Sequence, residues 1–300
     1  MIERGKSFLR LTSISTSSGK LHPGTSAVTI YKYTTPVAFS STTPLNIPIS
    51  PSHTAQNAHP PSNLRRPRPS SQSLAKAFFN EPLYGQYMHP HREQYPDDVY
   101  LTFLHKLRLA WLGSMDQVLV SYKSNPEDTS KEIITGCAHW NRISSSSGDG
   151  WLTTAKIAAM KTYSYLESFA YPNRAADPSR LPILSEAGPY CAHFWTGTRS
   201  EVWDLVLLGV DPSQGRQGFG KELVAWGFEK AKGEGVGCSV TSSQGNEGWY
   251  QRCGFETLVG WVGEQGGMRN PIKREGIPGG AVLFWDNGRG TEGVEEYVEK

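Results

Sequence analysis

The feature of this sequence that most constrains its fold is an apolar run that leads directly into a glycine-rich turn and then a helical pattern. Trp203 to Val210 (WDLVLLGV) is almost continuously apolar, which indicates a central strand covered on both faces. The turn SQGRQGFG follows, and Lys221 to Lys232 (KELVAWGFEKAK) carries apolar residues at helical spacing with charges opposite. This order predicts a helix N-terminus whose unpaired backbone N–H groups can bind an anion.

The composition of the turn narrows the kind of anion it can hold. Gly218 and Gly220 have no side chains to block close approach, and the backbone amides from Arg216 to Lys221 can surround a pyrophosphate. The guanidinium of Arg216 can add a charge-assisted contact. The turn lacks the GK[ST] ending of a P-loop and the GxGxxG spacing of a dinucleotide fold, so both common nucleotide sites are disfavoured. A glycine-rich turn can also simply reverse the chain, and the turn alone leaves that alternative open.

Periodicity elsewhere predicts a sheet flanked by helices. Helices are expected at 73–79 (SLAKAFF), 97–112, 152–169 and 243–253. Strands, besides the one at 203–210, are expected at 117–123, 132–142, 236–241, 255–262 and 281–286, the last of which closes the sheet. The polar stretch SNPEDTSK between the first two is typical of an antiparallel hairpin. Ala27 to Tyr33 alternates like a half-buried strand and is a candidate for the true first strand.

Three segments flank or interrupt this pattern. Residues 1–73 are rich in Ser, Thr, Pro and basic residues and almost free of acidic ones, which is typical of either a disordered segment or an organelle transit peptide. The expected domain therefore spans 74–286, and 287–300 forms a tail. Within the domain, 144–197 breaks the pattern and is expected to be an insertion that shapes a pocket. The expected location is cytoplasmic, or mitochondrial if the basic N-terminus is a transit peptide.

Charge and cysteine usage favour a small-molecule partner over nucleic acid. The 300-residue chain has a formal net charge of only +2, too little for the dense basic surface that binds phosphate backbones. No run approaches the roughly 18 apolar residues of a membrane-spanning helix. The four cysteines show no CxxC pairing, which suggests a reducing compartment and no zinc site. His89 and His91 have the close spacing of a metal-binding pair, but the flanking prolines and the lack of further spaced ligands favour a loop.

Two stretches resemble the motifs of a known enzyme family. VDPSQGRQGFGKELV, which begins at Val210, resembles motif A of the GCN5-related N-acetyltransferases (GNAT), whose core reads Q/R-x-x-G-x-G/A, and SSQGNEGWYQRCGFETLVG, which begins at Ser242, resembles their motif B. With GCAHWNR upstream, the arrangement over 74–286 is similar to that of uncharacterised fungal acyl-CoA N-acyltransferase-like proteins. The resemblance implies an α+β fold with a mixed, mostly antiparallel, twisted sheet of about six or seven strands flanked by helices, and acetyl-CoA as co-substrate.

The same resemblance implies which residues bind the coenzyme. The bulged fourth strand of the family offers backbone N–H groups to the thioester, which by position implicates Leu208, Gly209 and Val210. The pyrophosphate turn implicates Gly215, Arg216, Gln217, Gly218, Phe219, Gly220 and Lys221. Two positions depart from the family pattern: Gly215 stands where glutamine or arginine is usual, with Gln214 one place early, and Ser243 stands where an asparagine is often found. We expect the first departure to weaken coenzyme binding rather than abolish it.

Acetyl transfer to an amine needs a neutral nucleophile, stabilisation of the thioester oxygen and a proton for the leaving thiolate. Tyr250 matches the motif B tyrosine and is the expected general acid, with a packing role near the coenzyme as the alternative. Glu201 and Asp204, just before and on the fourth strand, are candidates for the base, and either could instead be a solvated charge at a strand end. His139, on the preceding strand, is expected to be structural.

These features predict an N-acetyltransferase that moves an acetyl group from acetyl-CoA to an amine by direct attack. The acceptor is a small molecule or a protein lysine, and no metal, membrane or nucleic-acid partner is expected. Two alternatives stay open: an inactive acyl-CoA-binding protein on the same fold, and an interaction module that docks a protein through 144–197. The oligomeric state is open as well.

Overall fold

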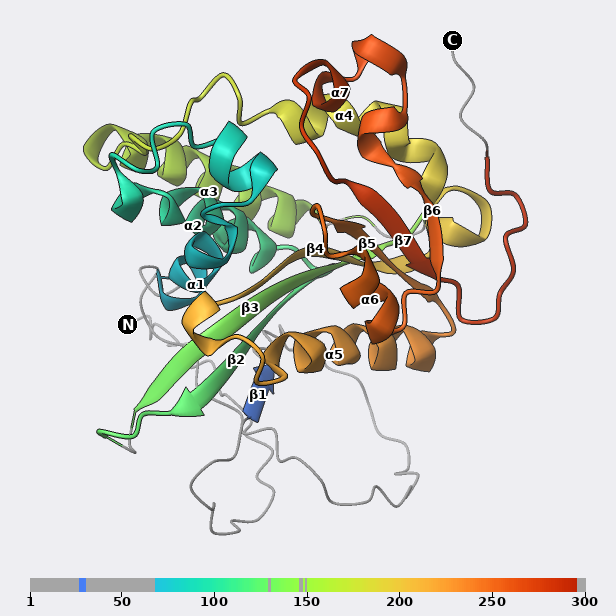
Figure 1. Ribbon diagram of the computed structural model, residues 1–300, viewed down its shortest axis with the longest axis horizontal. Helices are drawn as coiled ribbons and strands as arrows, with labels where there is room; N and C mark the ends of the chain where they lie inside the picture. The colour runs from blue at the N-terminus through green and yellow to red at the C-terminus, as the bar shows by residue number, and fades with distance from the viewer. Residues whose placement is uncertain (1–26, 31–67, 129–130, 146–147, 149, 296–300) are drawn as a thin grey trace, which may run out of the picture.

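The computed structural model describes residues 27–30, 68–128, 131–145, 148 and 150–295, and Figure 1 labels its elements. The strands are β1 (Ala27–Ile30), β2 (Asp116–Ser124), β3 (Glu132–Ile143), β4 (Val202–Val210), β5 (Gly237–Ser242), β6 (Thr257–Trp261) and β7 (Ala281–Trp285). The α-helices are α1 (Arg68–Phe78), α2 (Tyr100–Ala110), α3 (Trp151–Ala170), α4 (Ile183–Cys191), α5 (Phe219–Glu234), α6 (Glu247–Cys253) and α7 (Pro271–Arg274). A π-helix, η1 (Pro82–Tyr87), and 3-10 turns η2 (Pro96–Asp98), η3 (Ala192–Trp195), η4 (Gly197–Ser200), η5 (Pro212–Gln214), η6 (Val262–Glu264) and η7 (Gly267–Arg269) connect them. Most of the 1–73 segment, with its predicted targeting or disorder, lies outside the described residues.

The seven strands form one open mixed sheet in the order β1-β2-β3-β4-β5-β7-β6. All neighbours are antiparallel except β4 and β5, which confirms the predicted mixed and mostly antiparallel sheet. The prediction that 281–286 closes the sheet is wrong, because β7 lies inside it, between β5 and β6. Residues 281–284 are fully buried, as a strand with two neighbours requires, whereas the β6 side chains are exposed or half-buried at the edge.

Helices cover both faces of the sheet. α5 and α6 lie on one face, and α1, α2 and α4 lie on the other (Figure 1). On the α5 face, a Cβ at Gly227 would lie 2.2 Å from Cζ2 of the fully buried Trp140. The indole Nε1 of Trp140 donates a 3.2 Å hydrogen bond to the carbonyl of Leu223. The α5 backbone therefore packs directly on an indole ring, and only glycine fits inside the helix at that point.

The opposite face is equally tight where α1 crosses β4. A Cβ at Gly209 would lie 2.9 Å from the side chains of both Leu74 and Ala77. On the same helix, Lys76 Nζ pairs with the Asp211 carboxylate at 2.7 Å, just beyond the end of β4. These contacts fix α1 close to the segment that leads into the glycine turn.

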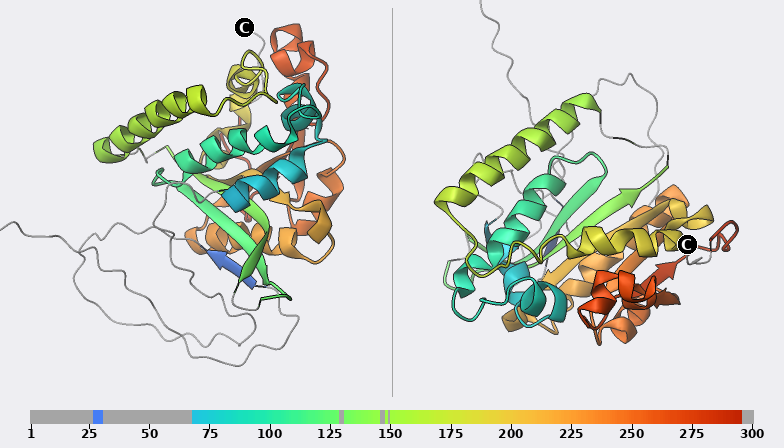
Figure 2. Two further views of the ribbon diagram at one scale, coloured as in Figure 1. Left: turned by 90° about the vertical axis from the view of Figure 1, so that its left-hand side faces the viewer. Right: turned by 90° about the horizontal axis from the view of Figure 1, so that it is seen from above.

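The segment 144–197 contains α3, which runs along the outer side of α2 (Figure 2). Its bounds extend the predicted helix 152–169 by one residue at each end, and none of its described residues is buried. Arg108 of α2 pairs with Glu167 of α3, and its guanidinium lies 5.4 Å from the centroid of the Tyr163 ring. Among the described residues, no helix combines the length and apolar content needed to cross a bilayer.

Candidate active site

Strands β4 and β5 run side by side over only part of their length. Their parallel pairing joins Val202–Leu205 to Gly237–Val240. Beyond Leu205, β4 keeps its pairing with β3, whereas β5 keeps its pairing with β7. Within the described residues, nothing pairs with the β5 side of β4 after this point, so its backbone groups there face an opening between the two strands.

A β-bulge in β4 marks the point where the strands separate. His139 of β3 pairs with Leu207 and Trp140 pairs with Leu205, so Val206 is the extra residue, and its side chain is 41% exposed. The bulge shifts the alternation of the strand, because Leu205 packs on the α5 face whereas Leu207 packs on the α1 face. The bulge in β4 therefore lies at Val206, two residues before 208–210. Residues 208–210 stay in register with β3 beside the opening.

The glycine turn forms the N-terminus of α5. Gly218 is the N-cap, with a φ of 90°, and its carbonyl accepts the first helical hydrogen bond, from the amide of Glu222, at 3.1 Å. The amides of the first turn, Phe219 to Lys221, therefore have no carbonyl acceptor within the helix. A Cβ at Gly218 would meet no atom within 4 Å, which leaves the approach to these amides open. Arg216 also has a positive φ, 61°, which L-residues rarely adopt.

Gly215 plays a different part from the rest of the turn. Its amide donates to the carbonyl of Pro212 at 3.2 Å and so closes η5. The side chain of Gln214, one place early by the family pattern, donates to Ser213 Oγ at 3.1 Å. The amides that stay available for an anion therefore begin after Gly215.

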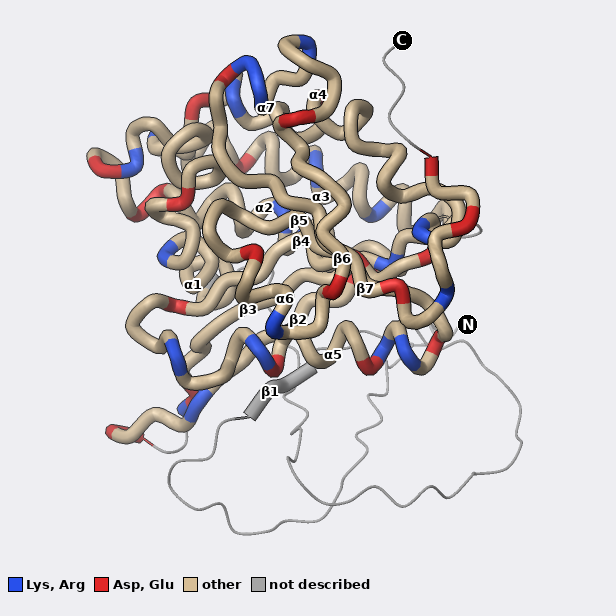
Figure 3. Tube along the Cα trace, turned by 45° about the vertical axis from the view of Figure 1, so that its right-hand side comes forward, with Lys and Arg blue, Asp and Glu red and all other residues tan. Residues whose placement is uncertain are grey.

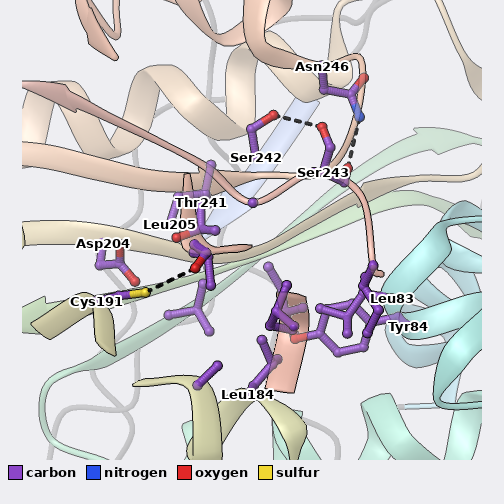
Figure 4. A pocket seen from close by; sticks show the side chains of 18 of the residues that line it. Leu83, Tyr84, Leu184, Cys191, Asp204, Leu205, Thr241, Ser242, Ser243 and Asn246 are labelled. Carbon is purple, nitrogen blue, oxygen red and sulfur yellow. Dashed lines mark hydrogen bonds between the residues drawn. The ribbon is translucent and has the colours of Figure 1, made fainter. Parts of the chain in front are cut away.

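Helix α6 brings the motif B residues to the same region. A Cβ at Gly220 would lie 3.3 Å from Cζ2 of Trp249, so the first turn of α5 lies against α6. The ring centroids of Trp249 and Tyr250 are 4.9 Å apart in an edge-to-face contact. Asn246 Nδ2 donates to Ser243 Oγ at 2.9 Å (Figure 4). An asparagine side chain therefore lies beside Ser243. Asn246 comes three residues after the position at which the family motif often has its asparagine.

A cavity of about 470 Å³ lies at the opening between β4 and β5. Its walls come from β4, β5, α4, the connection between α1 and η1, and the segment that leads into β7. Asp204, Leu208, Ser243, Asn246 and Tyr250 all line it, and Figure 4 shows Asp204 and Tyr84 on different sides of the same space. Among the predicted residues, Glu201, Gly209, Val210 and 215–221 lie outside its walls.

Asp204 is the carboxylate at the point where the strands separate. It accepts a 2.6 Å hydrogen bond from Ser239 Oγ, which itself accepts one from Trp195 Nε1 at 3.0 Å. Burial raises the pKa of Asp204 to about 6, while the Ser239 hydrogen bond and the charge of His139 act in the opposite direction. A carboxylate with this pKa is ionised near neutral pH and is a stronger base than an ordinary aspartate.

Tyr250 lines the cavity from α6. Burial, with a smaller contribution from Cys253, raises the pKa of Tyr250 well above its usual value. The phenol therefore keeps its proton throughout the neutral pH range, as a general acid must. The cavity thus brings Asp204 and Tyr250 together, from β4 and α6 respectively.

Glu201 is placed elsewhere. Its carboxylate accepts hydrogen bonds from Ser144, Ser145 and Arg142, the last at 2.8 Å. Burial acts to raise the pKa of Glu201, but these hydrogen bonds outweigh it and hold the pKa below its usual value. A carboxylate occupied in this way is a poor base, so the expectation that Glu201 and Asp204 are equal candidates is not supported by the geometry.

His139 and His89 both have polar partners within the fold. His139 Nε2 lies 2.6 Å from the Asp116 carboxylate, and His89 contacts the Tyr84 carbonyl at 2.5 Å and Thr102 Oγ1 at 2.8 Å. No group of three or more His, Cys, Asp or Glu side chains among the described residues could hold a metal ion. The cysteines at 137, 191, 238 and 253 are free thiols.

Three residues of the site are not identified from the sequence. Trp195 and Ser239 orient Asp204, and Glu81 lines the far wall of the cavity. Neither Trp195 nor Glu81 belongs to a motif, and both reach the site through long-range folding. The aromatic stretch around 195 inside the expected insertion, with Tyr190, Phe194 and Trp195, is a signal that could have pointed to a pocket wall.

Residues 180–255, about a quarter of the chain, match the acetyltransferase (GNAT) family, and this span includes β4, the glycine turn and all of α6. No curated protein matches the chain. One solved structure, histone acetyltransferase HPA2 and related acetyltransferase from Corynebacterium glutamicum, is 17% identical, with a TM-score of 0.43 over 78% of this chain and 97% of that one. Another, mosquito arylalkylamine N-acetyltransferase like 5b, is 11% identical, with a TM-score of 0.34 over 72% and 93%.

With TM-scores this low, the assignment depends on the family match and on the fold itself. The matched span contains the bulged strand β4 and the glycine-capped helix α5, and the motif resemblance predicts both a bulged fourth strand and a glycine turn before a helix. Residues 180–255 therefore match the GNAT acetyltransferase family, within a mixed sheet flanked by helices.

Proposed function

We propose that the protein is an N-acetyltransferase that moves the acetyl group of acetyl-CoA to an amine by direct attack. The observation that carries the proposal is the cavity at the separation of β4 and β5, where Asp204 and Tyr250 face the same space. The proposed coenzyme position has its pyrophosphate at the amides of 216–221 and its thioester near 208–210. Ser243 and Asn246 are polar contacts for the arm between these points.

In this proposal Asp204 takes a proton from the amine and Tyr250 gives one to the leaving thiolate. The amine nitrogen attacks the thioester carbon, the new N–C bond forms and the C–S bond breaks. An amine that arrives as an ammonium ion releases one further proton to solvent, so that the products are the amide, the coenzyme thiol and H⁺. Asp204 then gives its proton to solvent and the Tyr250 phenolate takes one from solvent, which restores both groups. Supporting the roles are the raised pKa of Asp204 and the protonated state of the buried phenol.

Acetyl-CoA binding measured by calorimetry and release of the coenzyme thiol over a panel of amines test the proposal together. Binding and turnover on at least one amine are expected, with turnover reduced in Tyr250→Phe. Acetyl-CoA binding without turnover on any amine would instead favour an inactive acyl-CoA-binding protein. A chain that does not bind acetyl-CoA would favour the interaction module.

A further inference from the structure

The charged side chains that line the cavity are all of one sign. Glu81 and Asp204 are its ionisable carboxylates, and among the described residues no lysine, arginine or histidine lines it. Elsewhere basic and acidic residues are mixed along the chain (Figure 3). The cavity therefore differs from the surface in having negative charge with no cation in its walls.

Both carboxylates are held in place by hydrogen bonds. Glu81 is the N-cap of η1 and accepts a hydrogen bond from the amide of Tyr84 at 2.6 Å. Asp204 is fixed by Ser239 on β5. Burial raises the pKa of each group, so the charged form of each is disfavoured and is stabilised by a positive charge that comes within reach.

Apolar side chains form much of the remaining wall of the cavity. Phe78, Tyr84, Leu184, Trp195, Ile272 and Ile277 all line the cavity. A ligand with an apolar body removes these surfaces from water, which favours its binding. A ligand that carries a carboxylate or phosphate would lose hydration and find no cation to replace it.

From this arrangement, and resting on the proposed acetyltransferase function, we propose that the acceptor is a small primary amine on an apolar aromatic or branched aliphatic body, without an acidic group. The ammonium form is drawn to the two carboxylates, and the apolar body lies between Tyr84 and Leu184. An amino acid with the same side chain is rejected because its carboxylate would be buried beside Asp204 or Glu81.

Matched pairs of amines test the proposal. Initial rates of coenzyme thiol release are measured for 2-phenylethylamine against L-phenylalanine, for isoamylamine against L-leucine, and for a lysine-containing peptide. We expect kcat/KM for each amine to exceed that for its amino acid by about 100-fold or more. Equal rates within a pair, or a preference for the peptide, would overturn the acceptor class and leave the acetyltransferase function standing.

If acetyl-CoA binds but no amine is turned over, the acceptor class is tested by calorimetry instead, which measures binding of the amine and of the amino acid to the coenzyme-saturated protein. Binding of 2-phenylethylamine in preference to L-phenylalanine would support the proposal, and binding of neither would overturn it. Absence of acetyl-CoA binding is a separate result, which removes the proposed function itself.

A substitution that adds a cation gives a readout that loss of folding cannot imitate. Leu184→Arg places a guanidinium in the cavity wall, and we expect the preference for 2-phenylethylamine over L-phenylalanine to fall at least about tenfold. The matched control is Leu181→Arg, since Leu181 is 39% exposed and lies outside the cavity. Unchanged selectivity in Leu184→Arg, with normal melting behaviour, would count against the proposal.

Discussion

Ser239 on β5 donates a 2.6 Å hydrogen bond to Asp204 on β4, and the two residues are register partners in the short parallel segment of the sheet. Only Leu205 and Val240 pair beyond them before the strands separate. The carboxylate is therefore anchored to both strands at the floor of the opening. Its position depends on the sheet rather than on a loop, which suits a group that must hold a fixed distance from a substrate.

The first prediction concerns the pH dependence of activity. Because the pKa of Asp204 is raised to about 6 and its base form is the ionised one, kcat/KM should rise with pH through about 6. Asp204→Asn should lower kcat/KM by about 100-fold and remove this rise. The measurement is a pH–rate profile from about pH 5 to 8. An unchanged profile in Asp204→Asn would assign the base to another group.

Ser239→Ala refines that test without removing the base. The Ser239 hydrogen bond lowers the pKa of Asp204, so its loss should move the acidic limb of the profile to higher pH. The same variant should keep most of its activity at the alkaline end of the profile, where Asp204 is ionised in both chains. A limb that does not move would show that the profile does not report Asp204.

The second prediction concerns stability and the same carboxylate. Asp204 has a higher pKa in the folded chain, about 6, than its ordinary value of 3.8, so the folded state holds this proton more tightly between these two values. Its contribution to stability is therefore greatest at low pH and is lost as pH rises through the folded pKa. At neutral pH, Asp204→Asn should have a free energy of unfolding about 1 to 3 kcal/mol higher than that of the unsubstituted chain. Denaturant titrations should show that this difference shrinks toward about pH 4, and a constant difference would contradict the assignment.

The third prediction separates proton donation from coenzyme binding. Tyr250→Phe removes the hydroxyl from a residue that is 8% exposed while keeping its ring contacts with Trp249 and Phe255. We expect kcat to fall by about 100-fold while the affinity for acetyl-CoA changes less than about threefold. Tyr163→Phe, on exposed α3, is the matched control. A fall in affinity with kcat preserved would assign Tyr250 to packing instead.

Most elements can be predicted from the sequence because their patterns are local. The predicted helix 221–232 agrees with α5, Phe219–Glu234, to within two residues at each end. The predicted strand 203–210 agrees with β4, Val202–Val210, to within one residue. Both agree because the spacing of apolar residues within a segment reflects which of its own faces are buried. The position of β7 inside the sheet cannot be predicted in this way, because strand order depends on pairing between distant segments. The hydrogen bond from the Gly215 amide to the Pro212 carbonyl depends on the local turn geometry, and it cannot be predicted from the sequence pattern either.

The candidate site divides in the same way. Asp204 and Tyr250 are predicted from strand position and motif, and the fold brings them to one cavity. Trp195 and Glu81 escape prediction because Trp195 acts through a partner 44 residues away and Glu81 caps a helix with no distinctive pattern. Glu201 is a weaker candidate for the base than Asp204 because Arg142, 59 residues away in the sequence, donates a hydrogen bond to its carboxylate.

The fourth prediction tests the glycine turn. Gly218 has a φ of 90° and open space at its Cβ, so Gly218→Val adds both backbone strain and bulk at the mouth of the amide cradle. We expect the Kd for coenzyme A to rise at least about tenfold, measured by calorimetry. Gly233→Ala, in the last turns of the same helix with space for a Cβ, is the control and should leave the Kd unchanged. Equal affinity in both variants would place the pyrophosphate elsewhere.

The fifth prediction concerns the packing of α5, which holds that turn in place. A Cβ at Gly227 would lie 2.2 Å from a ring atom of Trp140, whose indole also donates to the α5 backbone at Leu223. Alanine favours a helix over glycine by about 1 kcal/mol, but the overlap should cost more, so Gly227→Ala should lower the free energy of unfolding by about 1 to 3 kcal/mol. The double variant Gly227→Ala with Trp140→Phe removes the overlapping ring atoms and should recover part of that loss. Denaturant unfolding of the four chains of this cycle measures the coupling, and strictly additive effects would show that the two residues are not in the contact described.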